Sequence, residues 1–546
     1  MRARLRLGLL CAGLNVAESA LVLGIDKSDA PSLATQASAI APFGAFHDLR
    51  WVSVYQDSWL TFALELVAML LIRGFITAVC VRWAWPATSP SPSLVTGFGQ
   101  GILATAVSAF FVAPCVALLF GLAVVPISWL FIAAVPLVLL VALVVHPIAV
   151  SGSWWRRALA PRALWWVFVS FAVLDLAAIA TDASPGPVRI LVAAASGVFN
   201  AWAWIGLVSA VVDRRPARHV VPMVPVALAV LAGIVIGGAL LGFNGAHPVT
   251  PVYNDGPSPG SASATPVLLV SGYGSEWDGQ AVHPIPGNFY EIRFSYSGLS
   301  ADGQPLPYTS HDTVKSLAAL DKMLGEQIDA LHDRTHRRID VVAESEGSLI
   351  AETYLLATQQ APVDSVVYAS PLISPGRVWY PTGSQGWGVA SVEGMQILSD
   401  AFQSVAPIDL SPDSAFLKSL DMAAPTLQSL YSCSVPGVRQ FALLPLADSV
   451  AMPADTTLGF PYAVVPAFHG GLTSSPAGAP VIAEALEHGS ASTSSIWRYM
   501  EDAFSAAASA WQVPNLAETD YPGGKAQATS CDAVGKALAS YIRSAS

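Results

Sequence analysis

The sequence predicts an α-helical membrane bundle followed by an α/β domain, and its composition and charge lead to that class. Hydrophobic residues make up 53% of the 546 residues and charged residues only 12%, whereas a soluble domain carries roughly a quarter charged residues. Residues 1–245 hold 14 basic and 9 acidic side chains, and the remainder holds 13 and 29. We expect a membrane domain over residues 1–243 and an acidic domain over 266–546. The acidic charge of the second domain argues against nucleic acid as a partner.

About seven stretches are apolar enough to cross a bilayer, which takes about 20 residues for a core about 30 Å thick. They are residues 5–24, 58–80, 97–121, 124–147, 164–181, 189–212 and 220–242. Arginines cluster at 2–6, 82, 156–162 and 214–218. If each stretch crosses the membrane once, all these clusters fall on the same side. Because cytoplasmic loops carry an excess of Arg and Lys, the N-terminus is predicted inside and the C-terminal half outside. Arg outnumbers Lys 21 to 6, as in GC-rich bacterial genomes, so the membrane is predicted to be the plasma membrane.

Two features of the spans leave alternatives open. The first stretch has the basic start and short apolar run of a signal peptide, and its removal leaves the later orientation unchanged. Four charged residues also fall within spans: Glu18, Glu65, Arg73 and Asp175. They mark either an ion or substrate pathway or polar packing between helices, and the latter is favoured because no span repeats such charges.

The α/β domain is predicted from the alternation of short apolar runs with amphipathic stretches. Residues 244–265 are rich in Gly, Pro and Ser, which predicts a flexible linker in front of it. Strands are expected at 266–270, 289–296, 338–343, 363–369, 439–445 and 462–467. Helices are expected at 317–332, 348–358, 497–510 and 532–543.

One strand–turn–helix run has the pattern of a serine nucleophile. In Ile339-Asp-Val-Val-Ala-Glu-Ser-Glu-Gly-Ser-Leu-Ile350 a strand ends and a helix begins on either side of Ser345. The tight turn needs small residues two positions away on each side, and Ala343 and Gly347 meet that need. The alternative role of Ser345 is an ordinary helix cap.

A nucleophilic serine needs a base and an orienting acid, which follow it in the order acid, then histidine. His469, between a strand and a Gly-rich turn, is preferred as base over His488, which ends a helical stretch. Asp448, at the end of the 439–445 strand, is preferred as acid over Asp455 and Asp413. A plain turn-forming role is the alternative for Asp448.

The oxyanion hole and the cysteines complete the site residues. The residue after the nucleophile, Glu346, is expected to supply one backbone N–H group, and Gly272 or Tyr273 of the loop after the first strand the other. Cys433 and Cys531, the two cysteines of the outer domain, form a disulfide candidate. The sequence has no Cys and His cluster with metal-ligand spacing, so neither a metal nor a cofactor is predicted.

Taken together, these motifs resemble the α/β-hydrolase superfamily on its lipase and esterase side, over about residues 266–545. The resemblance rests on four runs in order: Leu268-Leu-Val-Ser-Gly-Tyr-Gly274, Val342-Ala-Glu-Ser-Glu-Gly347, Asp448 with Val450 and Pro453, and Phe468-His-Gly-Gly-Leu472. It implies an eight-stranded, mostly parallel sheet and an acyl-enzyme. It departs from the family at Ser271-Gly272, where His-Gly is usual, and at Ala343.

The family often inserts a lid between late strands, and the resemblance places it here at about residues 374–438. This stretch contains Trp379 and Trp387. A surface insertion of no function is the alternative.

The function expected from these features is hydrolysis of carboxylic esters, with lipid or acyl esters as the expected substrates, by a membrane-anchored serine hydrolase facing outward. Its partners would be the lipid bilayer and an ester substrate. A thioesterase or peptidase would use the same residues. The alternative outside the enzymes is a multi-span sensor or transporter-like protein whose hydrolase-like domain only binds.

Overall fold

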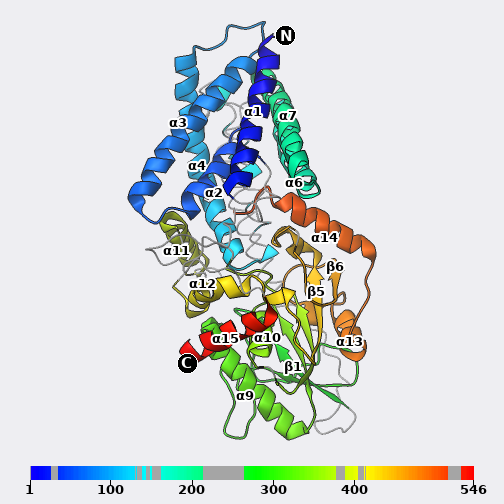
Figure 1. Ribbon diagram of the computed structural model, residues 1–546. Coiled ribbons are helices and arrows are strands. Elements are labelled where there is room, and N and C mark those ends of the chain that lie inside the picture. Colours follow the sequence, from blue (N-terminus) through cyan, green and yellow to red (C-terminus); the bar gives the residue numbers. More distant parts are fainter. Residues whose placement is uncertain are drawn as a thin grey trace.

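The chain forms a helical region and an α/β region that pack end to end in a computed structural model (Figure 1). The structure describes residues 2–25, 35–128, 161–212, 264–358, 360–376, 388–403, 411, 413–454, 456–513 and 530–545, and single residues between 131 and 150. The coarse order of the prediction, helices first and an α/β region second, is confirmed.

Five helices of the described residues are long and apolar enough to cross a membrane. They are α1 (Arg2–Ile25), α3 (Trp59–Ala84), α4 (Leu94–Val124), α6 (Pro161–Asp182) and α7 (Gly186–Val212). Each coincides with a predicted span. The predicted span at 220–242 lies outside the described residues, and so does half of 124–147. The side chains of Ser58 and Ser93 accept the backbone N–H groups of Thr61 and Thr96, which caps the starts of α3 and α4.

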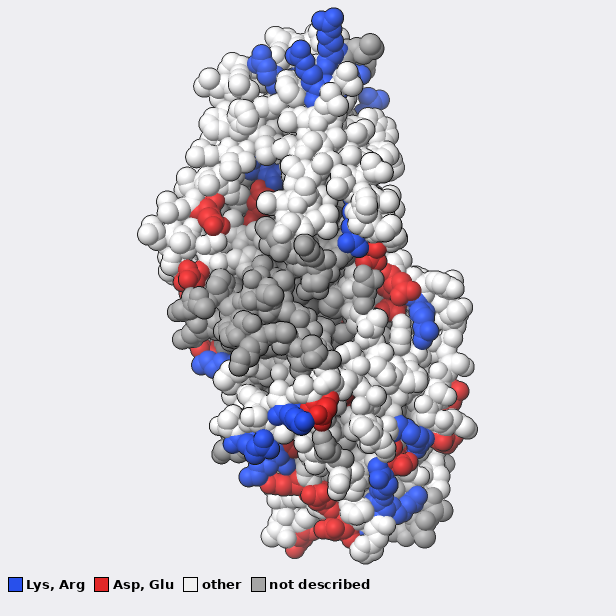
Figure 2. Space-filling model, in the orientation of Figure 1, with Lys and Arg blue, Asp and Glu red and all other residues white. Residues whose placement is uncertain are grey.

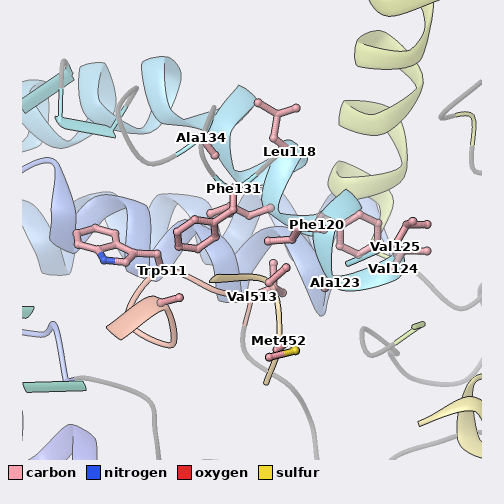
Figure 3. Close-up of a cluster of buried hydrophobic side chains, with 14 of the residues drawn as sticks. Leu118, Phe120, Ala123, Val124, Val125, Phe131, Ala134, Met452, Trp511 and Val513 are labelled. Carbon is pink, nitrogen blue, oxygen red and sulfur yellow. The ribbon is translucent and has the colours of Figure 1, made fainter. Parts of the chain in front are cut away.

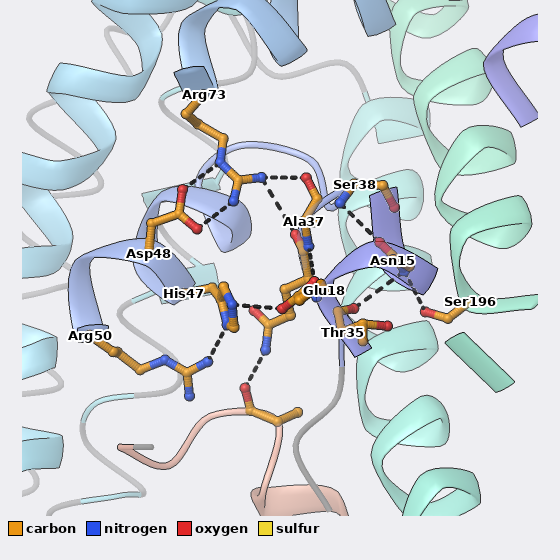
Figure 4. Close-up of polar contacts among 12 residues, drawn as sticks. Asn15, Glu18, Thr35, Ala37, Ser38, His47, Asp48, Arg50, Arg73 and Ser196 are labelled. Carbon is orange, nitrogen blue, oxygen red and sulfur yellow. Dashed lines mark hydrogen bonds and ion pairs between the residues drawn. The ribbon is translucent and has the colours of Figure 1, made fainter. Parts of the chain in front are cut away.

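A short helix that the sequence did not predict lies at the inner end of this bundle. Helix α2 (Phe43–Val54) is buried along most of its length and packs against α3 and α4. It carries His47, Asp48 and Arg50, so its sequence lacks the apolar run by which spans are recognised. His47 and Arg50 are buried and contact each other, and Asp48 pairs with Arg73 of α3 (Figure 4).

The charged residues of the spans take part in this packing. Arg73 donates to both carboxylate oxygens of Asp48, at 2.8 and 2.5 Å, and therefore pairs with α2 (Figure 4). Glu18 contacts His47 at 2.8 Å, and Asp175 accepts the indole N–H of Trp511 at 2.6 Å. Glu65 is exposed on α3. The contacts of Glu18, Arg73 and Asp175 are polar packing between elements, the interpretation that the sequence favours.

The described residues of the α/β region contain six strands, all parallel, in the order β2-β1-β3-β4-β5-β6. The strands are β1 (Thr265–Val270), β2 (Phe289–Arg293), β3 (Ile339–Glu344), β4 (Val363–Ala369), β5 (Arg439–Pro445) and β6 (Tyr462–Val465). Each starts within one residue of its predicted position. The eight strands implied by the family resemblance are not reached among the described residues.

Helices cover both faces of the sheet. Helices α9 (Leu317–Thr335), α10 (Glu346–Ala357) and α15 (Cys531–Ala545) pack together over one face. Helix α13 (Ala479–His488) packs on the other, where alternate strand residues such as Val342 and Phe441 meet Ile482. This alternation follows from the period of two along a strand.

A long insertion between β4 and β5 contacts the helical region. It contains α11 (Val389–Gln403) and α12 (Ala415–Leu427), which the sequence did not predict. The Ser391 hydroxyl donates to Ser53 O at 3.0 Å, and Val389 N–H donates to Gln56 O at 2.9 Å. Trp379 and Trp387 of the predicted lid lie outside the described residues.

The two regions share one continuous hydrophobic cluster (Figure 3). Helix α14 (Ser495–Ala508) lies against α6, and the Trp511 ring beyond it stacks on Phe171 with centroids 4.7 Å apart. Figure 3 shows Trp511, Val513 and Met452 beside Phe120 and Phe131 of the helical region. Residues 244–263 of the predicted linker are outside the described residues, but a packed interface joins the two regions.

Candidate active site

Ser345 occupies a strained turn between β3 and α10. Its backbone has φ 58° and ψ −119°, outside the regions that residues with a Cβ ordinarily occupy, which costs of order 1–3 kcal/mol. The turn brings chain segments close together: a Cβ on Gly347 would lie 2.6 Å from Val270 O, closer than atoms pack. Ala343 is fully buried. The small residues of the small-x-Ser-x-Gly pattern are therefore required by the packing.

Three predicted side chains lie in a hydrogen-bonded row. Ser345 Oγ is 2.8 Å from Nε2 of His469, and Nδ1 of the same ring is 2.7 Å from Oδ2 of Asp448. Ser345 follows β3, Asp448 lies in a short 3₁₀ turn after β5 (Leu446–Val450), and His469 follows β6. Because parallel strands end at one edge of a sheet, residues 124 and 21 positions apart meet there.

The charges around His469 favour its protonated form. Burial alone would lower the pKa of this histidine, but the charge of Asp448, the hydrogen bond to it and the charge of Glu344 together raise the pKa above its usual value. An imidazole in this setting can accept a proton from the Ser345 hydroxyl and hold it as an imidazolium stabilised by Asp448.

The alternative acids and base are placed elsewhere. His488 is exposed at the end of α13, where its Nδ1 contacts Glu484 O at 3.2 Å. Asp413 pairs with Lys418 at 3.0 Å, and both side chains are exposed. Asp455 lies outside the described residues.

The predicted oxyanion loop lies directly against the serine. A Cβ on Gly272 would lie 2.8 Å from Ser345 Cβ and 3.2 Å from its Oγ, so only glycine permits this approach. The ring of the next residue, Tyr273, packs against the ring of Phe416 of α12, with centroids 5.4 Å apart and planes tilted by 33°, which brings the β4–β5 insertion beside the loop.

A buried chain of polar groups holds the oxyanion loop. The Tyr296 hydroxyl donates to Ser271 O at 2.6 Å and lies 3.1 Å from Oε2 of Glu346. Burial raises the pKa of Glu346 well above its usual value, and the hydrogen bond that its carboxyl accepts from Tyr296 opposes this rise. Arg293 donates to the Ser271 hydroxyl at 2.8 Å, and Gly274 N–H donates to the Thr313 hydroxyl at 2.9 Å.

The sequence did not indicate the role of Glu344, which precedes the serine. Its buried carboxylate accepts Leu472 N–H at 2.6 Å and the Thr473 hydroxyl at 2.8 Å. Those residues lie three and four positions after His469. Glu344 therefore ties the serine turn to the histidine loop. No motif contains this link, because one of its donors is a backbone N–H group 128 positions away.

Two further features concern residues that the sequence analysis named. Phe468, which precedes His469, is 68% exposed. Cys433 and Cys531 are joined in a disulfide that attaches the start of α15 to the end of the β4–β5 insertion. Among the described residues, no group of three or more His, Cys, Asp or Glu side chains is placed to hold a metal ion.

Comparisons with family models, with curated proteins and with solved structures found no match to this chain.

Proposed function

We propose that the protein is a membrane-anchored serine hydrolase that cleaves carboxylic esters. The observation that carries the proposal is the continuous Ser345–His469–Asp448 row at the carboxyl edge of the sheet. The backbone strain at Ser345 supports it, because strain of this kind persists where the surrounding structure imposes it and is common at active sites.

The proposed mechanism proceeds through an acyl-enzyme. Ser345 Oγ attacks the ester carbonyl carbon while its proton passes to Nε2 of His469. The N–H groups of Glu346 and of Gly272 or Tyr273 stabilise the negative oxygen of the tetrahedral intermediate. His469 then protonates the leaving alcohol as the ester C–O bond breaks. A water molecule, deprotonated by His469, then attacks the acyl carbon. The bond from that carbon to Ser345 Oγ breaks as His469 returns the proton to Oγ, which releases the acid and restores the serine.

The α/β region fits the hydrolase superfamily in the features that bear on this chemistry. The strand–serine–helix turn, the order Ser, Asp, His and the insertion between β4 and β5 match the expected arrangement. We propose that the insertion acts as the acyl-binding lid, because its Phe416 contacts Tyr273 beside the serine.

The proposed orientation places the α/β region outside the plasma membrane. Arg2, Arg4 and Arg6 begin α1, Arg82 lies near the end of α3, and Arg162 lies near the start of α6. Figure 2 shows basic residues gathered at the end of the helical region farthest from the α/β region, above a largely uncharged belt. Basic residues favour the cytoplasmic side of a membrane.

A lipid or long acyl ester is the proposed substrate class. Phe468 beside the base is exposed, and α14 lies next to the spanning helix α6 (Figure 1). Ile496 and Phe504 of α14 are exposed as well, Ile496 to 55%. Exposed apolar groups beside a spanning helix are suited to the membrane interface, where lipid esters are concentrated.

The test uses the full-length protein in detergent or nanodiscs. The wild type is expected to react with a fluorophosphonate probe and to hydrolyse p-nitrophenyl acyl esters, and Ser345→Ala is expected to lose the labelling and at least 1000-fold in kcat. Because the pKa of His469 is raised and the base must be neutral, activity should fall as pH drops, with a midpoint above about 6.5.

Ser365→Ala is the matched control, since Ser365 is a buried serine of β4 whose hydroxyl donates to Asp340 at 2.6 Å, near the start of β3 and away from the row. Equal hydrolysis by wild type and Ser345→Ala would reject the proposal and favour a sensor or transporter component with a non-catalytic binding domain. Parallel assays with acyl thioesters and peptides would separate an esterase from a thioesterase or peptidase.

A further inference from the structure

The segment Ser509–Val513, which follows α14, lies between the helical region and the loop that carries Asp448. On the helical side, Arg50 donates to Gln512 O and Gln36 donates to Ala510 O. The Trp511 indole donates to Asp175 at 2.6 Å, and its ring packs against Phe171. The segment is therefore held by α2, by α6 and by the chain that precedes α2.

On the other side, the same segment holds the backbone of the loop from Asp448 to Met452, which we call the acid loop. The Gln512 side-chain N–H₂ group donates to Val450 O and to Met452 O, both at 3.0 Å. The Ser505 hydroxyl of α14 also donates to Met452 O, at 3.2 Å. Val450 and Met452 are two and four residues beyond Asp448. Figure 3 shows Met452 beside Val513 at this contact.

The position of the Asp448 carboxylate depends on this loop. Its Oδ2 contacts His469, but its buried Oδ1 has no hydrogen-bond partner in the part of the chain that the structure describes. The Ala451 and Met452 N–H groups donate to the backbone oxygen of Asp448, at 2.8 and 3.1 Å, and not to its carboxylate. The loop backbone therefore aims the side chain, and Gln512 and Ser505 restrain the loop at its far end.

We infer that Gln512 is a positioning residue for Asp448, through which the helical region helps to align the acid with His469. This inference rests on the proposed function. The helical region would then be part of the machinery of hydrolysis as well as an anchor. Small displacements matter in such a row, because a shift of about 1 Å in a catalytic group can cost about 100-fold in rate.

The test compares Gln512→Met with Gln327→Met in the full-length protein. Methionine keeps the volume of glutamine and removes its donors. Gln327 is the matched control: it is as buried as Gln512 and also bonds backbone groups, but those belong to Ser295 beyond β2, at the opposite edge of the sheet. Rates on a soluble ester are measured from pH 5 to 9, with the thermal unfolding midpoint of each variant.

We expect Gln512→Met to lower kcat about tenfold with KM within twofold. The acidic limb of its pH profile should move to lower pH, because a displaced Asp448 no longer supports the imidazolium of His469. Ser505→Ala, a milder change that removes one bond to the loop, should move the limb in the same direction by less. Gln327→Met should lower the unfolding midpoint and leave the limb in place.

Two results would overturn the inference. One is an acidic limb of the pH profile that stays at its wild-type position in both Gln512→Met and Ser505→Ala. The other is an equal displacement of the limb in Gln327→Met, which would make the effect a general consequence of losing a buried donor. Failure of the proposed function itself would look different: the wild type would neither label with fluorophosphonate nor hydrolyse the ester, and the inference would fall with it.

Discussion

Glu344 couples the serine turn to the histidine loop, and we expect its removal to weaken catalysis in a defined way. Glu344→Ala deletes the acceptor of Leu472 N–H and Thr473 Oγ and leaves a buried N–H group without its bond. It also removes a charge that raises the pKa of His469. We expect kcat to fall about tenfold and the acidic limb of the pH profile to move to lower pH.

Thr473→Val is the natural control for Glu344→Ala. It deletes one of the two bonds, keeps the shape of the side chain and leaves the carboxylate in place. A small loss of rate with an unmoved limb is expected. If the two variants behave alike in steady-state rate and pH profile, Glu344 has only a packing role.

The catalytic candidates could be predicted because a local pattern accompanies each of them. Ser345 has small neighbours two positions away, and His469 and Asp448 follow strands in the expected order. The roles of Glu344 and Gln512 could not be predicted, because the partners of these residues include backbone groups that the fold brings from distant positions. Their identity depends on tertiary placement, which no local periodicity encodes.

Helix α14 presents apolar side chains beside the spanning helices, and the next prediction concerns this element. The double variant Ile496→Ser, Phe504→Ser keeps the buried face of α14 and makes its exposed apolar face polar. If this face contacts lipid, hydrolysis of a long acyl ester presented in vesicles should fall several-fold, while kcat on a short soluble ester stays unchanged.

Asp502→Ser provides the comparison, because Asp502 is an exposed polar residue of the same helix. It should leave both rates unchanged. Equal rates of the double variant and the wild type on vesicles would show that α14 does not contribute to lipid access.

Strands and helices with a clear pattern of apolar residues could be predicted from the sequence. A helix whose burial depends on tertiary contacts could not. The six strands are short apolar runs between turn residues, and the five described spans are long apolar helices. Helix α2 combines polar and apolar residues in twelve positions and is buried on most sides, so neither rule detects it. Helices α11 and α12 were missed for another reason: their apolar and polar residues do follow a helical period, but they lie in a segment that was interpreted only as a lid.

For the molecule as a whole, the disulfide contributes to stability by joining residues 98 positions apart. The double variant Cys433→Ser, Cys531→Ser should lower the free energy of unfolding by up to about 4 kcal/mol, because the unfolded chain regains the freedom of a long loop. The measurement is the unfolding midpoint with and without a reductant. The wild type should respond to reductant and the double variant should not; an identical response would contradict the prediction.

The junction of the two regions is the part of the molecule that composition described least well. The Gly, Pro and Ser content of residues 244–265 suggested loosely tethered halves. The structure instead buries Arg50, Trp511 and Met452 where the two regions meet. Composition reports the local stiffness of a segment, whereas the fit between the surfaces on either side of it depends on the folded shapes.

Gln512 also has a consequence for when activity first arises. It follows Ser345, Asp448 and His469 in the sequence, so a ribosome adds it after all three have been made. In the proposed orientation, the acid loop would receive its restraint only after the segment that carries Gln512 had also crossed the membrane. A nascent chain would until then carry a complete but unaligned set of reactive groups, and hydrolysis would begin only outside the cell.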